Sequence, residues 1–223
     1  NKSQTIRMRG STYQSVLKNG LIFIMNVPVK KAGAYQLRIA VRDAASERVG
    51  SVSQFIEVPD LTKKRVTVSG IIVYGYEPKA GQVGTPATPA ASVRAGQSVN
   101  GAEGAQEEPD PQAGAALRRF RQGMIMNYGY VIYNAQLDKQ TRRPQLETQL
   151  RLFRDGKLIF TGKVQPVDPN QSDPARLLAG GGLRLGGELT PGEYVLQAVV
   201  TDLLAKDQKR RTTTQWIDFE IVK

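Results

Sequence analysis

Two stretches of this chain alternate apolar and polar residues in the way that β-strands do. In residues 35–42 the apolar side chains fall on odd positions with polar ones mostly between them, and residues 194–200 repeat the pattern with more apolar positions. A period of two is expected where one face of a sheet is buried and the other meets water. The pattern therefore predicts an extended strand at each place.

The two strands are copies of one unit. Residues 31–43 read KAGAYQLRIAVRD and residues 190–202 read TPGEYVLQAVVTD, so their identities share a constant offset of 159. A second match, between residues 54–57 and residues 215–218, has an offset of 161, which predicts a hairpin whose turn is two residues longer in the second copy. The identical positions in the first match are Gly33 and Gly192, Tyr35 and Tyr194, Leu37 and Leu196, Val41 and Val200, and Asp43 and Asp202.

A Gly-x-Tyr motif opens the alternating strand in both copies. In immunoglobulin-like sandwiches a tyrosine at such a corner hydrogen-bonds to nearby backbone while its ring packs at the edge of the core. We therefore predict tyrosine corners at Tyr35 and Tyr194. The alternative is that both are ordinary half-buried tyrosines.

Local signals place the other elements. Asp155 and Gly156 separate two short apolar runs in residues 151–160, and this pair tolerates the positive φ angles of a type I′ hairpin turn. Runs rich in β-branched and aromatic residues, bounded by Gly or Pro, predict further strands. These strands are residues 66–74 and 124–133, with residues 21–27 and 183–185 preceding the two Gly-x-Tyr strands. One helical turn is expected at residues 13–18, ended by an Asn-Gly pair.

The fold class that follows is all-β, with two immunoglobulin/fibronectin-III-like antiparallel β-sandwiches. Residues 1–61 form the C-terminal part of the first sandwich, because about 60 residues fall short of the roughly 100 that such a sandwich needs. Its remaining strands are expected upstream of this sequence or on another chain. Residues 62–223 form the second sandwich, with a long loop or disordered insert at residues 77–116 that is rich in Ala, Gly and Pro.

Composition excludes most familiar catalytic machinery. The 223 residues include no histidine and no cysteine, which removes Ser-His and Cys-His relays, cysteine nucleophiles, Cys/His zinc sites and disulfides. No apolar run approaches a membrane span, and the polar start of the sequence does not resemble a secretory signal. We therefore expect no enzyme activity and no membrane-spanning segment here.

Basic side chains outnumber acidic ones, with 31 Lys and Arg against 20 Asp and Glu, for a net charge of +11. Such a balance can attract phosphate backbones or anionic surfaces. The basic runs lie at predicted turns and linkers throughout the chain, so solvated loop charges explain them better than a nucleic-acid site. These runs are residues 30–31, 63–65, 118–119, 142–143 and 209–211.

Two further motifs have the wrong residues for ligand binding. Residues 168–173 begin like a calcium-binding loop, but the sixth position is Asp173 instead of Gly and the twelfth is Ala179, so we interpret them as a surface turn. The glycines at residues 180–182 and 186–187 lack the Lys-Ser/Thr pair and the following helix of a phosphate loop, so we interpret them as turns. No metal ion or other cofactor is expected.

One tyrosine-rich strand is the best candidate for a binding surface. Tyr128, Tyr130 and Tyr133, near two tyrosines of an earlier strand, could form a platform for a sugar or a partner protein. The alternative is that these rings pack in the core or on the sheet. A ligand site of this kind would also use neighbouring arginines. Those arginines are Arg118, Arg119 and Arg121.

Three segments resemble one protein family. VPVKKAGAYQLRIAVRDAAS at residues 27–46, PQLETQ at residues 144–149 and TTQWIDF at residues 213–219 are similar to the C-terminal region of VWFA-related (von Willebrand factor type A related) proteins of Acidobacteria. The likeness covers nearly the whole chain except the insert. It implies β-sandwich modules behind an upstream A domain, a surface or exported setting and no enzyme activity. The Asp-x-Ser-x-Ser metal motif of such A domains is absent, so no metal-binding residue is carried over.

Two functions stay open at this stage. The favoured one is a non-enzymatic tandem β-sandwich, the scaffold and protein–protein interaction module of a larger exported or envelope-associated protein that is secreted, periplasmic or at the cell surface. Its partners would be other protein chains or the upstream region of its own polypeptide, with peripheral envelope association. The alternative is a module that binds carbohydrate or an anionic polymer.

Overall fold

The computed structural model describes residues 7–21, 25–44, 46–78 and 110–223. The protein is nearly all β, which confirms the predicted fold class at that level. Its described helices are α1 (Gly10–Asn19) and short 3₁₀ turns at Leu61–Lys63, Pro111–Ala113 and Gln208–Arg210. Within the described ranges, no helix has the length and apolar character needed to cross a membrane.

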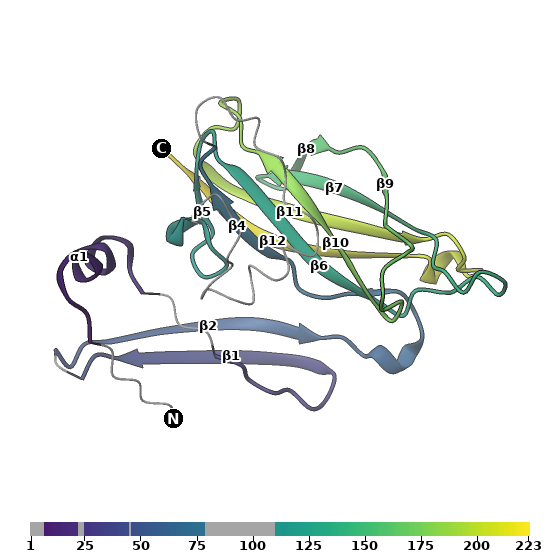
Figure 1. The fold of residues 1–223 in the computed structure, drawn as a ribbon, viewed down its shortest axis with the longest axis horizontal. Helices are drawn as coiled ribbons and strands as arrows, with labels where there is room; N and C mark the ends of the chain where they lie inside the picture. Colours follow the sequence, from purple (N-terminus) through teal and green to yellow (C-terminus); the bar gives the residue numbers. More distant parts are fainter. Residues whose placement is uncertain (1–6, 22–24, 45, 79–109) are drawn as a thin grey trace.

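A two-stranded sheet comes first in the chain. β1 (Gly33–Arg42) and β2 (Val49–Val58) pair antiparallel along their whole length. Among the described strands, neither one pairs with a strand of another sheet. Figure 1 shows this hairpin as a separate layer beside the larger β-structure.

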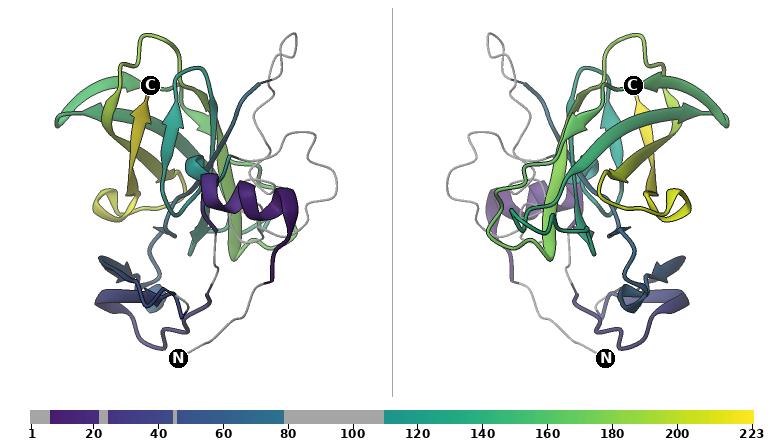
Figure 2. Two further views of the ribbon diagram at one scale, coloured as in Figure 1. Left: turned by 90° about the vertical axis from the view of Figure 1, so that its left-hand side faces the viewer. Right: turned by 90° about the vertical axis from the view of Figure 1, so that its right-hand side faces the viewer.

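The other strands form two larger sheets, which pack against each other as two layers (Figure 1 and Figure 2). The four-stranded sheet has β6 (Ile125–Tyr133) at its centre, paired with β10 (Arg176–Arg184), β3 (Thr67–Val68) and β4 (Ile72–Tyr76). The six-stranded sheet runs in the order β5 (Arg119–Arg121), β12 (Thr212–Val222), β11 (Gly192–Asp202), β7 (Leu146–Arg154) and β8 (Lys157–Thr161), with β9 (Gln165–Pro166) also on β7. All pairs are antiparallel except β5 with β12.

Apolar side chains of both sheets form one core. The four-stranded sheet contributes Val73, Met126, Ile132 and Leu177, and the six-stranded sheet contributes Leu152, Leu196, Val200, Phe219 and Ile221. Burying one such side chain stabilises a fold by about 1.5–3 kcal/mol. The Tyr130 hydroxyl on β6 also hydrogen-bonds to the Thr148 hydroxyl on β7, which ties the two sheets together.

Two local predictions are confirmed. Asp155 and Gly156 have φ angles of 49° and 72° and join β7 to β8, as a type I′ turn requires. Helix α1 ends at Asn19, and the backbone N–H of Gly20, at φ 80°, donates to the carbonyl of Val16 at 2.8 Å. The helix begins at Gly10, which is earlier than expected.

Other strand predictions needed correction. The run at residues 66–74 is divided into β3 and β4 around Gly70, and β4 continues to Tyr76. Residues 22–24 of the strand expected at 21–27 lie outside the described residues, and residues 25–27 form no strand. Residues 183–184 are only the end of the much longer β10.

The glycines at residues 180–182 lie inside β10, so the predicted turn was wrong. A Cβ at Gly180 would collide with the carbonyl oxygen of Tyr128, and a Cβ at Gly181 would lie 2.9 Å from the Tyr128 hydroxyl. Because these side chains are missing, β10 can approach β6 closely and the tyrosine ring can lie over the strand.

The C-terminal end of the predicted insert belongs to the core. Residues 79–109 lie outside the described residues, but Ala113 is fully buried. It packs so closely on β4 that a Cβ added at Gly75 would lie 2.8 Å from the Cβ of Ala113. The guanidinium of Arg121 forms ion pairs with Glu77 and Asp110, each at 2.8 Å. Arg121 therefore links Glu77 and Asp110, which lie close to the two ends of the segment 79–109.

The two copies fold as the same hairpin with a different register. Gly33 and Gly192 both have a φ angle of 146°, which L-residues with a side chain rarely adopt. Ten residues, 202–211, separate the last paired residues of the second hairpin, against six residues, 43–48, in the first, so the predicted difference of two was too small. A register shift by an even number of residues leaves every side chain on its own face of the sheet.

Candidate functional site

The hydroxyls of Tyr35 and Tyr194 make equivalent hydrogen bonds. Tyr35 donates to the carbonyl of Lys31 at 2.7 Å, and Tyr194 donates to the carbonyl of Thr190 at 2.6 Å. These are the backbone hydrogen bonds that a tyrosine corner requires. The two corners differ in burial, because Tyr194 is 2 % exposed whereas Tyr35 is only half-buried.

A neighbouring strand completes the second corner. Arg154, at the end of β7, donates to the Tyr194 hydroxyl at 3.1 Å and to the carbonyl of Pro191 at 3.2 Å, and its guanidinium lies over the Tyr194 ring. A Cβ at Gly192 would lie 3.2 Å from this guanidinium, so glycine makes room for it. In the first copy, the corresponding Gly33 meets only the ring of Tyr35 among the described residues.

The β1–β2 hairpin leaves open the face that is covered in β11–β12. Val41 is 58 % exposed, whereas its repeat partner Val200 is fully buried. Leu37 is half-buried where Leu196 is fully buried. Within the described residues, the second hairpin therefore packs against a second sheet, whereas the apolar face of the first is partly exposed.

The burial of Tyr130 favours packing in the core and on the sheet over a tyrosine platform. Tyr130 is 1 % exposed and Tyr128 lies over β10, since both project from the inward face of β6. Tyr133 is three residues beyond Tyr130, and because side chains alternate along a strand it projects from the opposite face of β6. Burial raises the pKa of both Tyr128 and Tyr130, as expected for phenols withdrawn from water. No exposed row of three tyrosines exists on this strand.

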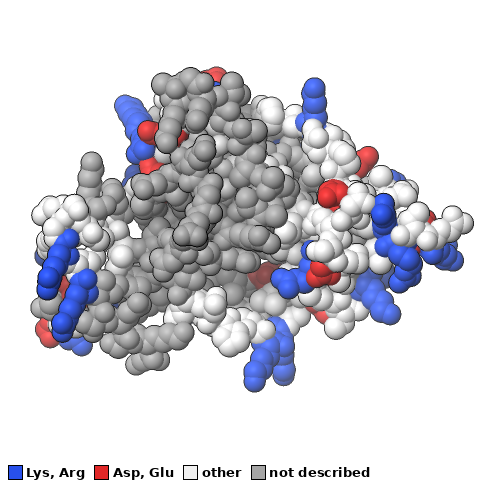
Figure 3. All heavy atoms as spheres, viewed as in Figure 1, with Lys and Arg blue, Asp and Glu red and all other residues white. Residues whose placement is uncertain are grey.

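The three predicted arginines lie on or beside β5, in the other sheet, and each one faces a carboxylate. Arg118 pairs with Asp218 and Arg119 pairs with Glu220, both at 2.9 Å, while Arg121 joins the two ends of the insert. Figure 3 shows Lys and Arg side chains at separate places over the visible face instead of in one patch. The structure does not bring these arginines together with the tyrosines as a ligand site.

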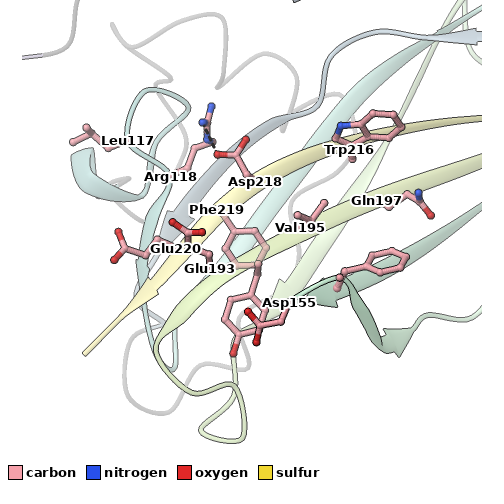
Figure 4. Close-up of a pocket in the computed structure, with 13 residues that line it drawn as sticks. Leu117, Arg118, Asp155, Glu193, Val195, Gln197, Trp216, Asp218, Phe219 and Glu220 are labelled. Carbon is pink, nitrogen blue, oxygen red and sulfur yellow. Dashed lines mark hydrogen bonds and ion pairs between the residues drawn. The ribbon is translucent and has the colours of Figure 1, made fainter. Parts of the chain in front are cut away.

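A hollow of about 900 Å³ lies on the outer face of the six-stranded sheet. Trp216, which is 61 % exposed, projects into it from β12, beside Val195 and Gln197 of β11 (Figure 4). Gln197 is the cross-strand partner of Trp216. Phe153 of β7 continues the same apolar surface, because it is the cross-strand partner of Val195.

Charged groups line the rest of the hollow. Four carboxylates and one guanidinium line the hollow, namely Asp155, Glu193, Asp218, Glu220 and Arg118. The Arg118–Asp218 ion pair fixes one of these carboxylates two residues beyond the tryptophan on β12 (Figure 4). The surface therefore offers a flat aromatic ring next to fixed hydrogen-bond donors and acceptors.

The sequence contained a signal for this surface that was not used. Residues 217–220 alternate between apolar and polar, and a period of two places Trp216 on the same face as Asp218 and Glu220. A tryptophan on the polar face of an alternating strand is expected to be exposed. In the repeat, Trp216 corresponds to Phe55.

Two basic runs that are far apart in sequence meet at a smaller hollow of about 200 Å³. Lys64 and Arg65 line it together with Arg210, but Asp202 and Asp207 line it as well. Asp207 pairs with Arg210 at 3.3 Å. Lys206 also lines the hollow, so four basic and two acidic side chains meet there, and Asp207 offsets one of the basic ones.

Residues 168–173 form a turn, as predicted, in which the Asp168 carboxylate accepts the backbone N–H of Asn170 at 2.9 Å. Among the described residues, no group of three or more acidic side chains gathers where it could hold a metal ion.

No protein-family model matches this chain, and no curated protein matches it. Among solved structures, the chain is similar to a family 123 glycoside hydrolase from Clostridium perfringens, with 10 % sequence identity and a TM-score of 0.32. The similarity covers 71 % of this chain and 27 % of the hydrolase chain. At this TM-score it indicates neither a shared fold nor a shared activity.

Proposed function

We propose that this chain is a non-enzymatic scaffold of two immunoglobulin/fibronectin-III-like β-sandwich units that assembles with other protein segments through the β1–β2 hairpin. The observation that carries this proposal is the repeat itself. β1–β2 has the corner and the strand pairing of β11–β12, but its apolar face is open among the described residues. The resemblance to VWFA-related proteins of Acidobacteria, and a secreted, periplasmic or cell-surface setting, belong to the same proposal.

The second hairpin indicates what the first one binds. β11 pairs antiparallel with β7, with Leu196 opposite Leu152, and β12 pairs in parallel with β5. By analogy, the free edge of β1 accepts an antiparallel strand whose alternate apolar side chains lie beside Leu37 and Ile39, and a second layer covers the apolar face that they share. Strand addition of this kind satisfies the unpaired backbone groups of an exposed edge. The added strands come from the flanking polypeptide or from another chain.

Hydrogen exchange tests this proposal. In the isolated monomeric chain, we expect the β1–β2 amides to exchange much faster than the β11–β12 amides, because a lone hairpin is at best marginally stable in water. In the full-length protein or assembly purified from its source, the β1–β2 amides should become protected. Equal protection of the two hairpins in the isolated monomer would contradict the proposal, because the first hairpin would then need no partner.

A matched pair of variants distinguishes docking on the apolar face from a general effect of a new charge on the β1–β2 hairpin. We expect Leu37→Asp to abolish the protection that β1–β2 gains in the assembly, because it places a charge on the covered face. Arg38→Asp changes the neighbouring residue on the opposite face and should leave that protection in place. Loss of protection in both variants, or in neither, would argue against strand addition on this face.

A further inference from the structure

We propose that the hollow at Trp216 is a binding site for a neutral saccharide, a function separate from strand addition at β1–β2. The exposed indole carries the argument. A tryptophan side chain that is 61 % exposed on a sheet forgoes most of the stabilisation that burial would give it. Its flat face can stack on the apolar C–H face of a pyranose ring, while the indole N–H remains a hydrogen-bond donor.

The surroundings of Trp216 suit the hydroxyl groups of a sugar. Gln197 stands opposite Trp216 on β11, and its amide can both donate and accept hydrogen bonds. The ion pair of Arg118 with Asp218, at 2.9 Å, holds a guanidinium and a carboxylate in place before a ligand arrives. Groups fixed in this way bind without the entropy cost of ordering two long side chains.

The charges of the hollow do not favour an anionic polymer, which is the other ligand class that the sequence analysis left open. Four carboxylates and one guanidinium line it, although the whole chain carries a net charge of +11. Ion pairs with Arg118, Arg119 and Arg154 offset three of these carboxylates, so the hollow has no excess of positive charge that would attract an anionic polymer. A neutral saccharide does not depend on such attraction, and a volume of about 900 Å³ accommodates more than one sugar ring.

The repeat supplies a second observation. Phe55 in β2 occupies the position of Trp216 in the sequence match, is 69 % exposed, and also has a glutamine, Gln36, as its cross-strand partner. An acidic residue follows each aromatic residue by two positions, as Glu57 in the first copy and Asp218 in the second. Both hairpins thus combine an exposed aromatic residue, a cross-strand glutamine and an acid, although the two glutamines are not equivalent positions of the repeat, in which Gln36 corresponds to Val195.

Trp216 is the single tryptophan of the chain, so its fluorescence reports on the hollow directly. We expect at least one member of a panel of neutral gluco-, xylo-, manno-, galacto- and chito-oligosaccharides to shift its emission, with saturation in the micromolar to millimolar range. Heparin fragments and oligolysine serve as the anionic and cationic comparisons. A panel without any emission change, or a change caused by either charged polymer alone, would overturn the proposal.

Calorimetric titration of variants with the saccharide that binds completes the test. Trp216→Ala should weaken binding by at least about tenfold, and Trp216→Phe, which keeps a stacking ring, should retain part of the affinity. Phe160→Ala removes an exposed aromatic ring that does not line the hollow and should leave the affinity unchanged. Because Trp216 is exposed, these variants should fold normally, which circular dichroism checks. Affinity that survives Trp216→Ala would refute the assignment of this site.

Discussion

The hydroxyls of Tyr35 and Tyr194 make the same hydrogen bond in two hairpins, each to the carbonyl oxygen four residues earlier in the chain, at 2.7 and 2.6 Å. Only the Tyr194 hydroxyl also accepts a hydrogen bond from Arg154. The shared corner indicates duplication of one structural unit, and the difference indicates that the strand contributed by β7 in one copy has no described counterpart in the other.

Removing each hydroxyl should show this difference. We expect Tyr194→Phe to lower the free energy of unfolding by about 1–3 kcal/mol, because it leaves buried polar groups without their partner. Tyr35→Phe, at a half-buried corner, should change it by less than about 0.5 kcal/mol. Urea unfolding followed by Trp216 fluorescence measures both. Equal losses would mean that the first corner is as tightly packed as the second.

A second matched pair tests the packing of the two hairpins. Leu196→Ala should destabilise the protein by about 2–5 kcal/mol, as expected when a fully buried leucine is truncated. Leu37→Ala, at the equivalent position, should cost well under about 1 kcal/mol in the isolated chain. The same urea transitions report these values. A large effect of Leu37→Ala would show that the face of β1–β2 is already covered.

Substitution of Gly180 in β10 should differ sharply from substitution of Gly187 in the following turn. Gly180→Ala places a Cβ against the carbonyl oxygen of Tyr128, and we expect a loss of about 1–3 kcal/mol or failure to fold. Gly187→Ala, where a Cβ would meet no atom within 4 Å, should be close to neutral. Thermal unfolding of the two variants provides the comparison. A neutral Gly180→Ala would mean that β6 and β10 can separate at no cost.

The loop between β6 and β7 should show a pH dependence at acidic pH. Hydrogen bonds from the backbone N–H groups of Thr141 and Gln140, and from the Thr141 hydroxyl, lower the pKa of Asp138 below its ordinary value. A lowered pKa in the folded state stabilises the loop above the unfolded-state pKa of about 3.9, and this contribution is lost as the pH falls through the folded-state pKa.

NMR titration of the Asp138 carboxyl group measures this pKa. We expect a midpoint below that of an unstructured aspartate. Thr141→Val removes the hydroxyl donor and should raise the midpoint partway, while Thr141→Ser should restore it. An ordinary midpoint in the unmodified chain would show that these hydrogen bonds do not persist in solution.

The sequence alone determined the elements whose signals are local. The Asp155-Gly156 turn and the stop of α1 at Gly20 follow from which residues tolerate positive φ angles, and these are properties of single residues. Alternation likewise predicted β1 and β11, because the period of two records which face of a strand is buried. Only a local rule was needed in each case.

Only the tertiary structure decided the features that depend on a neighbouring strand. Gly180 lies in a strand and not in a turn because β6 approaches it, and Tyr130 is buried because its side of β6 faces the second sheet. The exposure of Trp216 follows from its place on the polar face of its strand, but only the pairing of β12 with β11 places Gln197 opposite it. These outcomes depend on contacts between residues far apart in the chain, for which a single sequence contains no local signal.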